Sequence, residues 1–206
     1  MRIAATRGLH NAGMREVAAE AGVSVRLIQY YFGTKEELLR FTMEYLARQF
    51  AERVKARLGA IGAAGPPGPR AIIDAILTEA LPTDEDSRVF HIVYGSYAWL
   101  SLTDPVYAME FPAHASDVVE NVIAAQLARQ AGQAPAGFDA RAEATSLMAI
   151  SAGLSLEVLH GHRSADDALG ILHYHLDRLL PPEGALAGPV SETFKTAGGP
   201  GGTPVS

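Results

Sequence analysis

The sequence contains no cysteine among its 206 residues. Disulfide bonds and thiolate metal sites are therefore excluded, which is compatible with a reducing compartment. The first residues lack the apolar segment of a secretory signal peptide, and no apolar run approaches the roughly 18 residues that a membrane-spanning helix needs. We therefore expect a cytoplasmic protein that has no membrane partner.

The signatures of common enzyme classes are also missing. We find no phosphate-binding loop, no nucleophile elbow and no glycine-rich fingerprint after a strand. Two His-x-His pairs, His160 with His162 and His173 with His175, are the strongest hint of a metal site. In a helix, residues two apart point in different directions, unlike the i, i+4 pairs that chelate from one face. We expect no enzyme, cofactor or metal, and a histidine cluster at a dimer interface.

Acidic residues are scarce in the first part of the chain. Residues 1–60 hold ten Lys or Arg and six Glu, a net charge of +4, whereas the remainder has a net charge of −10. This asymmetry indicates a front end that binds an anion, although random clustering of solvated surface charge is an alternative.

Strand signals are nearly absent, and helical periodicity recurs along the chain. The glycines and prolines of residues 62–69 must end the first long helix. Residues 181–206, rich in Gly and Pro, predict a disordered tail. We expect an all-α protein with a helix-turn-helix domain over 1–40 and a helical body over 41–180. The expected helices of the body span residues 35–58, 69–81, 83–102, 106–131 (with a kink at Pro112), 139–162 and 165–180.

The last two predicted helices indicate a dimer. Residues 146–159 carry apolar or small side chains on every side, so this helix must be buried on more than one face. Packing against a second copy satisfies such a helix, and a two-fold dimer is the commonest arrangement. A fully internal helix in a monomer is the alternative. The predicted interface residues are Ile150, Leu154, Val158, Ile171, Leu172, His175 and Leu179.

Residues 14–32 predict two short helices joined by a sharp turn. Gly22 supplies a permissive backbone at the centre of the turn, and Ser24 is a candidate N-cap of the second helix. Ile28 and Phe32 lie four residues apart and can pack inward, which leaves the opposite faces free. This is the helix-turn-helix arrangement, whose second helix enters the DNA major groove.

The strings VAAEAGVS (17–24) and IQYYFGTKEELL (28–39) closely resemble the DNA-binding signature of the tetracycline repressor (TetR) family. The resemblance implies a homodimeric transcriptional repressor that binds a palindromic double-stranded DNA operator and is released by a small-molecule effector. Gly13 stands where this family often has a capping Thr or Ser, so that phosphate contact is expected to be lost. The residues implied to contact DNA are Ser24, Arg26, Leu27, Gln29, Tyr30, Tyr31 and Lys35.

The helix ahead of this motif is short, because only about Arg2 to Leu9 precede it. Half a helix is expected to leave the apolar surfaces of Val17 and Ile28 poorly covered. We therefore expect a true start upstream of Met1. The alternatives are a weakened DNA-binding domain, or a dimeric helical adaptor that does not bind DNA.

The same resemblance implies that the body holds an effector pocket between its middle helices. Aromatic side chains at helical spacing are more often core than ligand-binding, so each candidate has this simpler interpretation beside it. The predicted lining is Phe90, Tyr94, Tyr97, Trp99, Met109, Phe111, His114 and Met148.

Overall fold

The computed structural model describes residues 2–62, 65–104, 113–130 and 137–181. All regular structure in these ranges is helical, which confirms the predicted all-α class. The predicted tail lies almost entirely outside them. The elements are α1 (Arg2–Arg7), the 3-10 helix η1 (Leu9–Asn11), α2 (Met14–Ala21), α3 (Val25–Phe32), α4 (Lys35–Ile61), α5 (Pro69–Glu79), α6 (Glu85–Ser101), α8 (Ala113–Ala128), α9 (Ala140–Leu159) and α10 (Ala165–Leu179).

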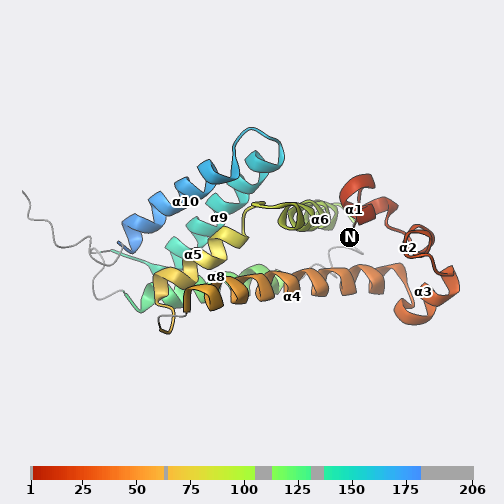
Figure 1. The fold of residues 1–206 in the computed structure, drawn as a ribbon, viewed down its shortest axis with the longest axis horizontal. Coiled ribbons are helices and arrows are strands. Elements are labelled where there is room, and N and C mark those ends of the chain that lie inside the picture. The colour runs from red at the N-terminus through yellow and green to blue at the C-terminus, as the bar shows by residue number, and fades with distance from the viewer. Residues whose placement is uncertain (1, 63–64, 105–112, 131–136, 182–206) are drawn as a thin grey trace, which may run out of the picture.

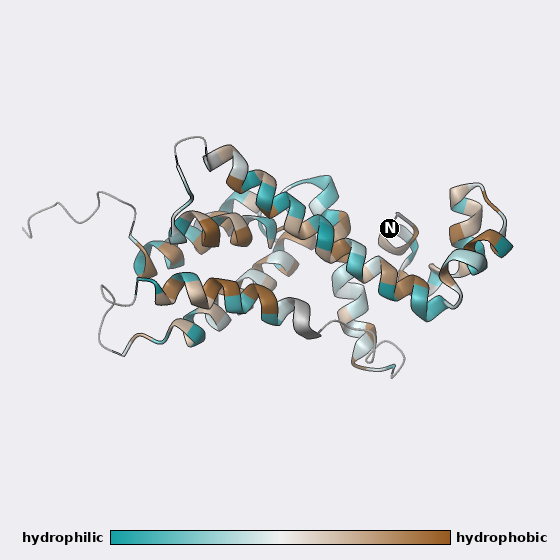
Figure 2. Cartoon of the chain, turned by 90° about the horizontal axis from the view of Figure 1, so that it is seen from below, coloured by the Kyte–Doolittle hydropathy of each residue, from teal (hydrophilic) through white to brown (hydrophobic). Residues whose placement is uncertain are grey.

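The long helix α4 connects the two ends of the molecule (Figure 1). Its 27 residues correspond to a length of about 40 Å. α2 and α3 lie at its N-terminal end, whereas α5 and α8 to α10 gather near its other end. Hydrophobic and hydrophilic residues alternate along α4 (Figure 2), as expected of a helix that packs on one side only.

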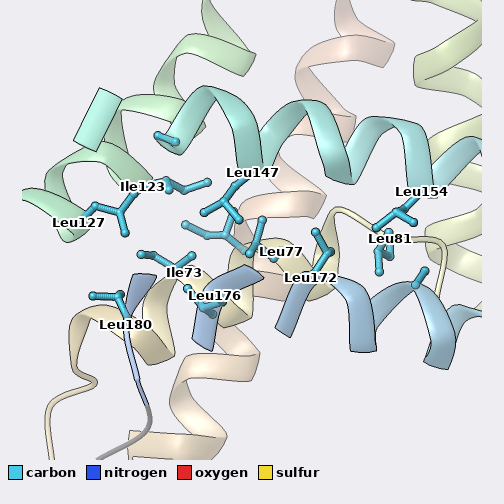
Figure 3. Close-up of a cluster of buried hydrophobic side chains, with 13 residues drawn as sticks. Ile73, Leu77, Leu81, Ile123, Leu127, Leu147, Leu154, Leu172, Leu176 and Leu180 are labelled. Atoms are coloured by element: carbon cyan, nitrogen blue, oxygen red, sulfur yellow. The ribbon is translucent and has the colours of Figure 1, made fainter. Parts of the chain in front are cut away.

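The body is held together by a cluster of buried aliphatic side chains (Figure 3). α5, α8, α9 and α10 each contribute, and their side chains point toward one another. Ile73, Leu77, Leu127, Leu147 and Leu172 are among its fully buried members. Burial of this apolar surface is the main force that holds the four helices together.

A second buried cluster joins the front helices to α6. It contains Ile3 and Leu9 from the front, Met43 from α4, and Val93 and Tyr97 from α6. The front unit therefore shares its apolar core with α6 of the body. This cluster also packs against Val17 of α2, one of the two residues whose cover the sequence left in doubt.

The expectation that a short first helix leaves Ile28 and Val17 poorly covered is wrong. Ile28 is buried, and Val17 is partly buried against the second cluster. Ile3, Leu9 and Ala12 belong to the cluster against which Val17 packs, because η1 continues the packing after α1 ends. The alternative of an adaptor without DNA binding, which depended on that poor cover, is therefore not favoured.

Most predicted helix boundaries agree with the structure to within three residues. Ser24 caps α3 as predicted, since its Oγ accepts a hydrogen bond from the backbone N–H of Leu27 (3.2 Å). Thr83, which precedes the acidic Glu85 and Asp86 and is therefore a candidate N-cap by sequence, does not cap α6. Asp84 does, because Asp84 and Ser87 form a reciprocal capping box. The segment predicted to start at residue 106 is described only from Ala113, and the expected kink at Pro112 lies outside the described residues.

α9 meets the length and composition of a membrane-spanning helix, contrary to our reading of the sequence. Its position in the fold gives a simpler explanation for its hydropathy. Leu147 and Leu154 pack in the body cluster, and Ser151 and Ser155 are buried beside them. A helix that packs in a bundle shows such a composition, and 28% of its apolar window is buried within this chain.

Candidate nucleic-acid interface and effector site

The turn between α2 and α3 fixes how α3 is presented. Gly22 ends α2 in the left-handed conformation (φ 67°), which a residue without Cβ adopts at little cost. α3 then starts at once behind the Ser24 cap and turns Ile28 into the interior. The remaining faces of this eight-residue helix are therefore free to meet another molecule.

The outward surface of α3 carries large, mostly apolar side chains that are exposed to solvent. Tyr30 and Tyr31 are 80% and 71% exposed, and Leu27 is 41% exposed. The two tyrosine rings meet edge to face, with centroids 5.4 Å apart. Arg26 and Gln29 are exposed on the same short helix. Aromatic, amide and guanidinium groups gathered on one protruding helix suit a polar, anionic partner.

Lys35 lies at the start of α4, beside this surface. Thr34 and Glu37 cap that end reciprocally: Thr34 Oγ1 accepts from the Glu37 N–H (3.1 Å), and the Thr34 N–H donates to Glu37 Oε2 (3.0 Å). Gly33 turns the chain here with φ 64°, where an added Cβ would lie 2.2 Å from Glu37 Oε2. The structure thus places all seven predicted DNA-contact residues on α3, its cap and the start of α4. Gly13, the N-cap of α2, makes no side-chain cap.

The predicted effector-site residues are only partly brought together. Phe90, Tyr94 and Tyr97 share the second cluster, with Tyr97 buried. Met148 packs instead against the body cluster, and Trp99 is 67% exposed, so these two do not join them. Helical periodicity placed Phe90, Tyr94 and Tyr97 on one side of their helix, but it did not show which other helices pack against that side. Met109 and Phe111, and the side chain of His114, lie outside the described residues.

An aromatic contact that the sequence did not predict links α4 with α6. The Phe50 ring of α4 stacks on Phe90 (centroids 5.8 Å apart), and Phe90 stacks on Tyr94 (5.9 Å). The Tyr94 hydroxyl shares a hydrogen bond with Ser116 Oγ of α8 (3.0 Å). Beside the stack, burial lowers the pKa of His91, whose Nε2 donates to the Glu79 carbonyl oxygen (3.3 Å). Three helices therefore meet at an aromatic surface with one polar end.

The predicted dimer residues divide into two groups. Ile150, Val158, Ile171, His175 and Leu179 are half-buried, so part of each side chain reaches the surface. Leu172 and Leu154 are buried in their own chain, which makes them core residues rather than contacts for a second copy. Two further apolar residues are exposed on the same helices, Leu156 (46%) and Tyr174 (59%).

A cavity of about 390 Å³ lies between α9, α10 and the segment that precedes α9. It mixes apolar side chains with the charged Glu143 and Arg178, and it includes three of the predicted dimer residues. It is separate from the aromatic stack. Its lining is Gly137, Phe138, Glu143, Ser146, Leu147, Ile150, His175, Arg178 and Leu179.

The first His-x-His pair does not have the helical geometry that we expected. α9 ends at Leu159, so His160 and His162 lie in the turn that follows, with ring centroids 5.7 Å apart. In the part of the chain that the structure describes, no third metal-binding side chain joins a group with them.

Comparison with known proteins identifies the family. Residues 1–40 match the family described as bacterial regulatory proteins, tetR family, and residues 69–181 match the C-terminal domain of BetI-type transcriptional repressors. The chain belongs to the TetR family of transcriptional regulators. The family domains are the DNA-binding helix-turn-helix unit and the helical C-terminal domain that the structure shows.

Relatives support the same assignment. The transcriptional regulator BetI of Yersinia pestis is 42% identical over 59 residues, which are 29% of this chain and 30% of BetI. PksA of Bacillus subtilis is 33% identical over 86 residues, 42% of this chain and 40% of PksA. The chain therefore matches less than half the length of these curated relatives, all of them transcriptional regulators rather than enzymes.

Two solved structures match over most of the fold. A transcriptional regulator from Rhodococcus superimposes with a TM-score of 0.71 and 26% identity, covering 87% of this chain and 90% of that one. A transcriptional regulator from Saccharomonospora viridis, solved in complex with choline, gives 0.72 and 27%, covering 85% and 90%.

Proposed function

We propose that this TetR-family regulator is a cytoplasmic repressor that binds a palindromic operator as a homodimer and is released by a small-molecule effector. The observation that carries the proposal is the exposed surface of α3. Tyr30, Tyr31, Arg26 and Gln29 project from a helix whose Ile28 anchors it to the fold. Exposed aromatic side chains that lie side by side are typical of a surface that binds another molecule, and tyrosine hydroxyls suit phosphate oxygens.

The chemistry of each side chain gives it a role. Gln29 can pair bidentately with adenine, and Arg26 with guanine or a phosphate. Tyrosine hydroxyls and the Lys35 ammonium, near the N-terminus of α4, suit phosphate oxygens. Ser24 and Leu27 lie at the N-terminal end of α3, which would face the groove. Phosphate contacts would set the position of the helix, and Gln29 would read sequence.

The dimer would form through α9 and α10. Small residues (Ala149, Ala152 and Gly153) are exposed on α9 together with Leu156, and Tyr174 is exposed on α10. Small side chains allow close helix approach, and a second copy would cover the exposed apolar atoms. Two-fold symmetry of the protein would then match a palindromic operator.

The aromatic stack of Phe50, Phe90 and Tyr94 is the proposed effector site on chemical grounds, whereas the 390 Å³ cavity lies between α9 and α10. Aromatic faces attract quaternary ammonium groups, and the relative from S. viridis was solved with choline. We infer that a cationic ligand of this type binds between α4, α6 and α8. Binding there would separate α4 from α6 and move the helix that carries α3.

We expect choline to weaken operator binding, and Tyr94→Ala to need more choline for the same release. Loss of one cation–π contact of about 0.5–2 kcal/mol corresponds to roughly a 2- to 30-fold increase in the choline concentration required. Fluorescence anisotropy of labelled operator DNA measures the release. Tyr45→Ala, which removes an exposed tyrosine elsewhere on α4, is the matched control. If operator binding does not change at millimolar choline, choline is not the effector.

Operator binding itself is tested by mobility shift on the promoter region nearest the gene for this protein. We expect retarded migration that weakens steeply with salt, because Lys and Arg contacts to phosphates release counterions. Tyr30→Phe should weaken binding to most sequences similarly, whereas Gln29→Ala should relax preference at one base pair in each half-site. A Gln29→Ala protein with unchanged sequence preference would show that Gln29 does not read a base.

A further inference from the structure

A buried carboxylate connects α4 with the end of α5. The Glu79 side chain is only 4% exposed. Its Oε2 accepts from Arg53 Nε (2.6 Å), and its Oε1 accepts from Arg57 Nε (3.0 Å) and Arg57 Nη2 (2.7 Å). Both arginines come from α4, one turn apart. Charged hydrogen bonds of this kind are strong and directional, so they fix the position of α4 along α5.

Arg53 also reaches the start of α6. Its Nη2 donates to Asp84 Oδ2 (2.6 Å), while Asp84 Oδ1 accepts from the Ser87 N–H (2.7 Å) and so caps α6. The hydrogen bond from Arg53 holds the pKa of Asp84 down to about 2, so the pair stays charged at neutral pH. One guanidinium thus ties α4 to the end of α5 and to the beginning of α6. We call Arg53, Arg57, Glu79 and Asp84 the arginine clamp.

The clamp lies far from the α3 surface but on the helix that carries it. Arg53 follows Lys35 by 18 residues of continuous α4, a distance of about 27 Å along the helix. α6 runs from the clamp back to the front unit, where Val93 and Tyr97 share a core with Ile3. α4 and α6 are therefore joined by two kinds of contact: by charges at the clamp, and by apolar contacts toward the front unit that include the Phe50–Phe90 stack.

The two junctions constrain motion differently. Apolar contacts are non-directional and permit small sliding of one helix on another. The clamp permits little, because a guanidinium meets carboxylates in a fixed, planar geometry. Ion pairs of this kind often add little net stability compared with apolar residues of the same size. Their main effect here is on geometry.

We propose that Arg53, with Glu79 and Asp84, positions the DNA-binding unit by fixing the angle between α4 and α6. These are positioning residues, since none of them lies on the α3 surface. The proposal rests on the proposed function, in which two copies must present α3 at the spacing of two half-sites. A tilt of α4 by 10° about the clamp would move its N-terminal end by about 5 Å, which is enough to mismatch that spacing.

The absence of cysteine makes the test direct. Ala19→Cys places one spin label on the exposed side of α2 in each copy. Pulsed dipolar spectroscopy then measures the distance between the two DNA-binding units of a dimer. Affinity is measured on unlabelled protein with a DNA fragment that the wild-type protein has selected from genomic DNA. Circular dichroism and sedimentation show that each variant is folded and dimeric at the temperature of the assay.

Arg53→Gln is expected to shift or broaden the distance distribution by several Å and to weaken DNA binding about 2- to 30-fold. Asp84→Asn is a milder variant, because asparagine still caps a helix but carries no charge. It should change the distance in the same direction. Arg70→Gln is the matched control. Arg70 is as exposed as Arg53 (30% against 31%) and donates to Asp177 and to the Leu180 carbonyl oxygen, but it contacts α10 rather than α4.

The outcomes separate the two proposals. A wild-type protein that gives no dipolar signal between copies, or retains no DNA, overturns the proposed function and the positioning role with it. If the wild-type protein dimerises and binds DNA, but Arg53→Gln and Asp84→Asn leave distance and affinity unchanged, the positioning role alone is overturned. Equal shifts with Arg70→Gln would also overturn it, since any lost ion pair would then have the same effect.

Discussion

Replacing Leu77 by alanine is expected to lower the free energy of unfolding by about 2–5 kcal/mol. Leu77 is fully buried on α5, where it packs with side chains of α8, α9 and α10 (Figure 3). The substitution removes apolar contacts with several helices and leaves a cavity that rigid neighbours cannot fill. Such a loss is a large part of the 5–15 kcal/mol that typically stabilises a domain. Urea unfolding followed by circular dichroism measures it.

Leu102→Ala is the matched control, because it makes the same chemical change at a side chain that is 74% exposed. It should change the free energy of unfolding by less than about 0.5 kcal/mol. Both variants must be unfolded at one protein concentration, since dimerisation would add a concentration-dependent term. A small effect of Leu77→Ala would mean that the body cluster is not the stabilising core.

The helix-turn-helix unit could be predicted from the sequence because its determinants are local. Gly22, the Ser24 cap and the spacing of Ile28 and Phe32 act within one or two turns of helix. Each imposes its geometry whatever the rest of the chain does. The same locality explains why the starts of α4 and α10 were predicted correctly.

The predictions of side-chain burial were wrong where burial depends on segments that are distant in the sequence. Periodicity places Trp99 and Met148 on particular helix faces but does not say which element covers each face. Trp99 is exposed, and Met148 packs in the other cluster. Leu172 was assigned to a dimer contact because its stripe is apolar, yet its own chain buries it completely. The packing of η1 and α6 against the front unit could not be predicted from the sequence for the same reason.

The arginine clamp was beyond sequence analysis for the same reason. Arg53 and Glu79 lie 26 residues apart on different helices, and each resembles an ordinary surface charge. Only the turn between α5 and α6 brings Glu79 and Asp84 to the same guanidinium. The positive charge of residues 1–60 that suggested an anionic partner is therefore partly used inside the protein. The raw count for residues 1–60 therefore overstates the charge that is available to DNA.

The largest functional effect is expected from the loss of Arg26. Arg26→Ala is expected to weaken operator binding at least about 30-fold, because each copy would lose about 1–3 kcal/mol and a dimer uses two copies. Arg26 is exposed near the start of α3, the part of a recognition helix that reaches base edges. Its loss leaves the fold intact, since Ile28 and the Ser24 cap hold the helix. Anisotropy titrations at fixed salt measure the change.

Arg129→Ala, in the turn that follows α8 and far from α3 along the chain, controls for the loss of one positive charge per copy. It should change operator affinity less than about twofold, because separations beyond the Debye length of about 8 Å are largely screened.

Competition with non-operator DNA then assigns the role of Arg26. If Arg26 pairs with guanine, the substitution weakens operator binding far more than non-operator binding. If Arg26 instead contacts a phosphate, the affinities for operator and for non-operator DNA fall by a similar factor, and the salt dependence of binding becomes shallower. Unchanged affinity for both kinds of DNA would place α3 outside the interface and contradict the proposed recognition surface.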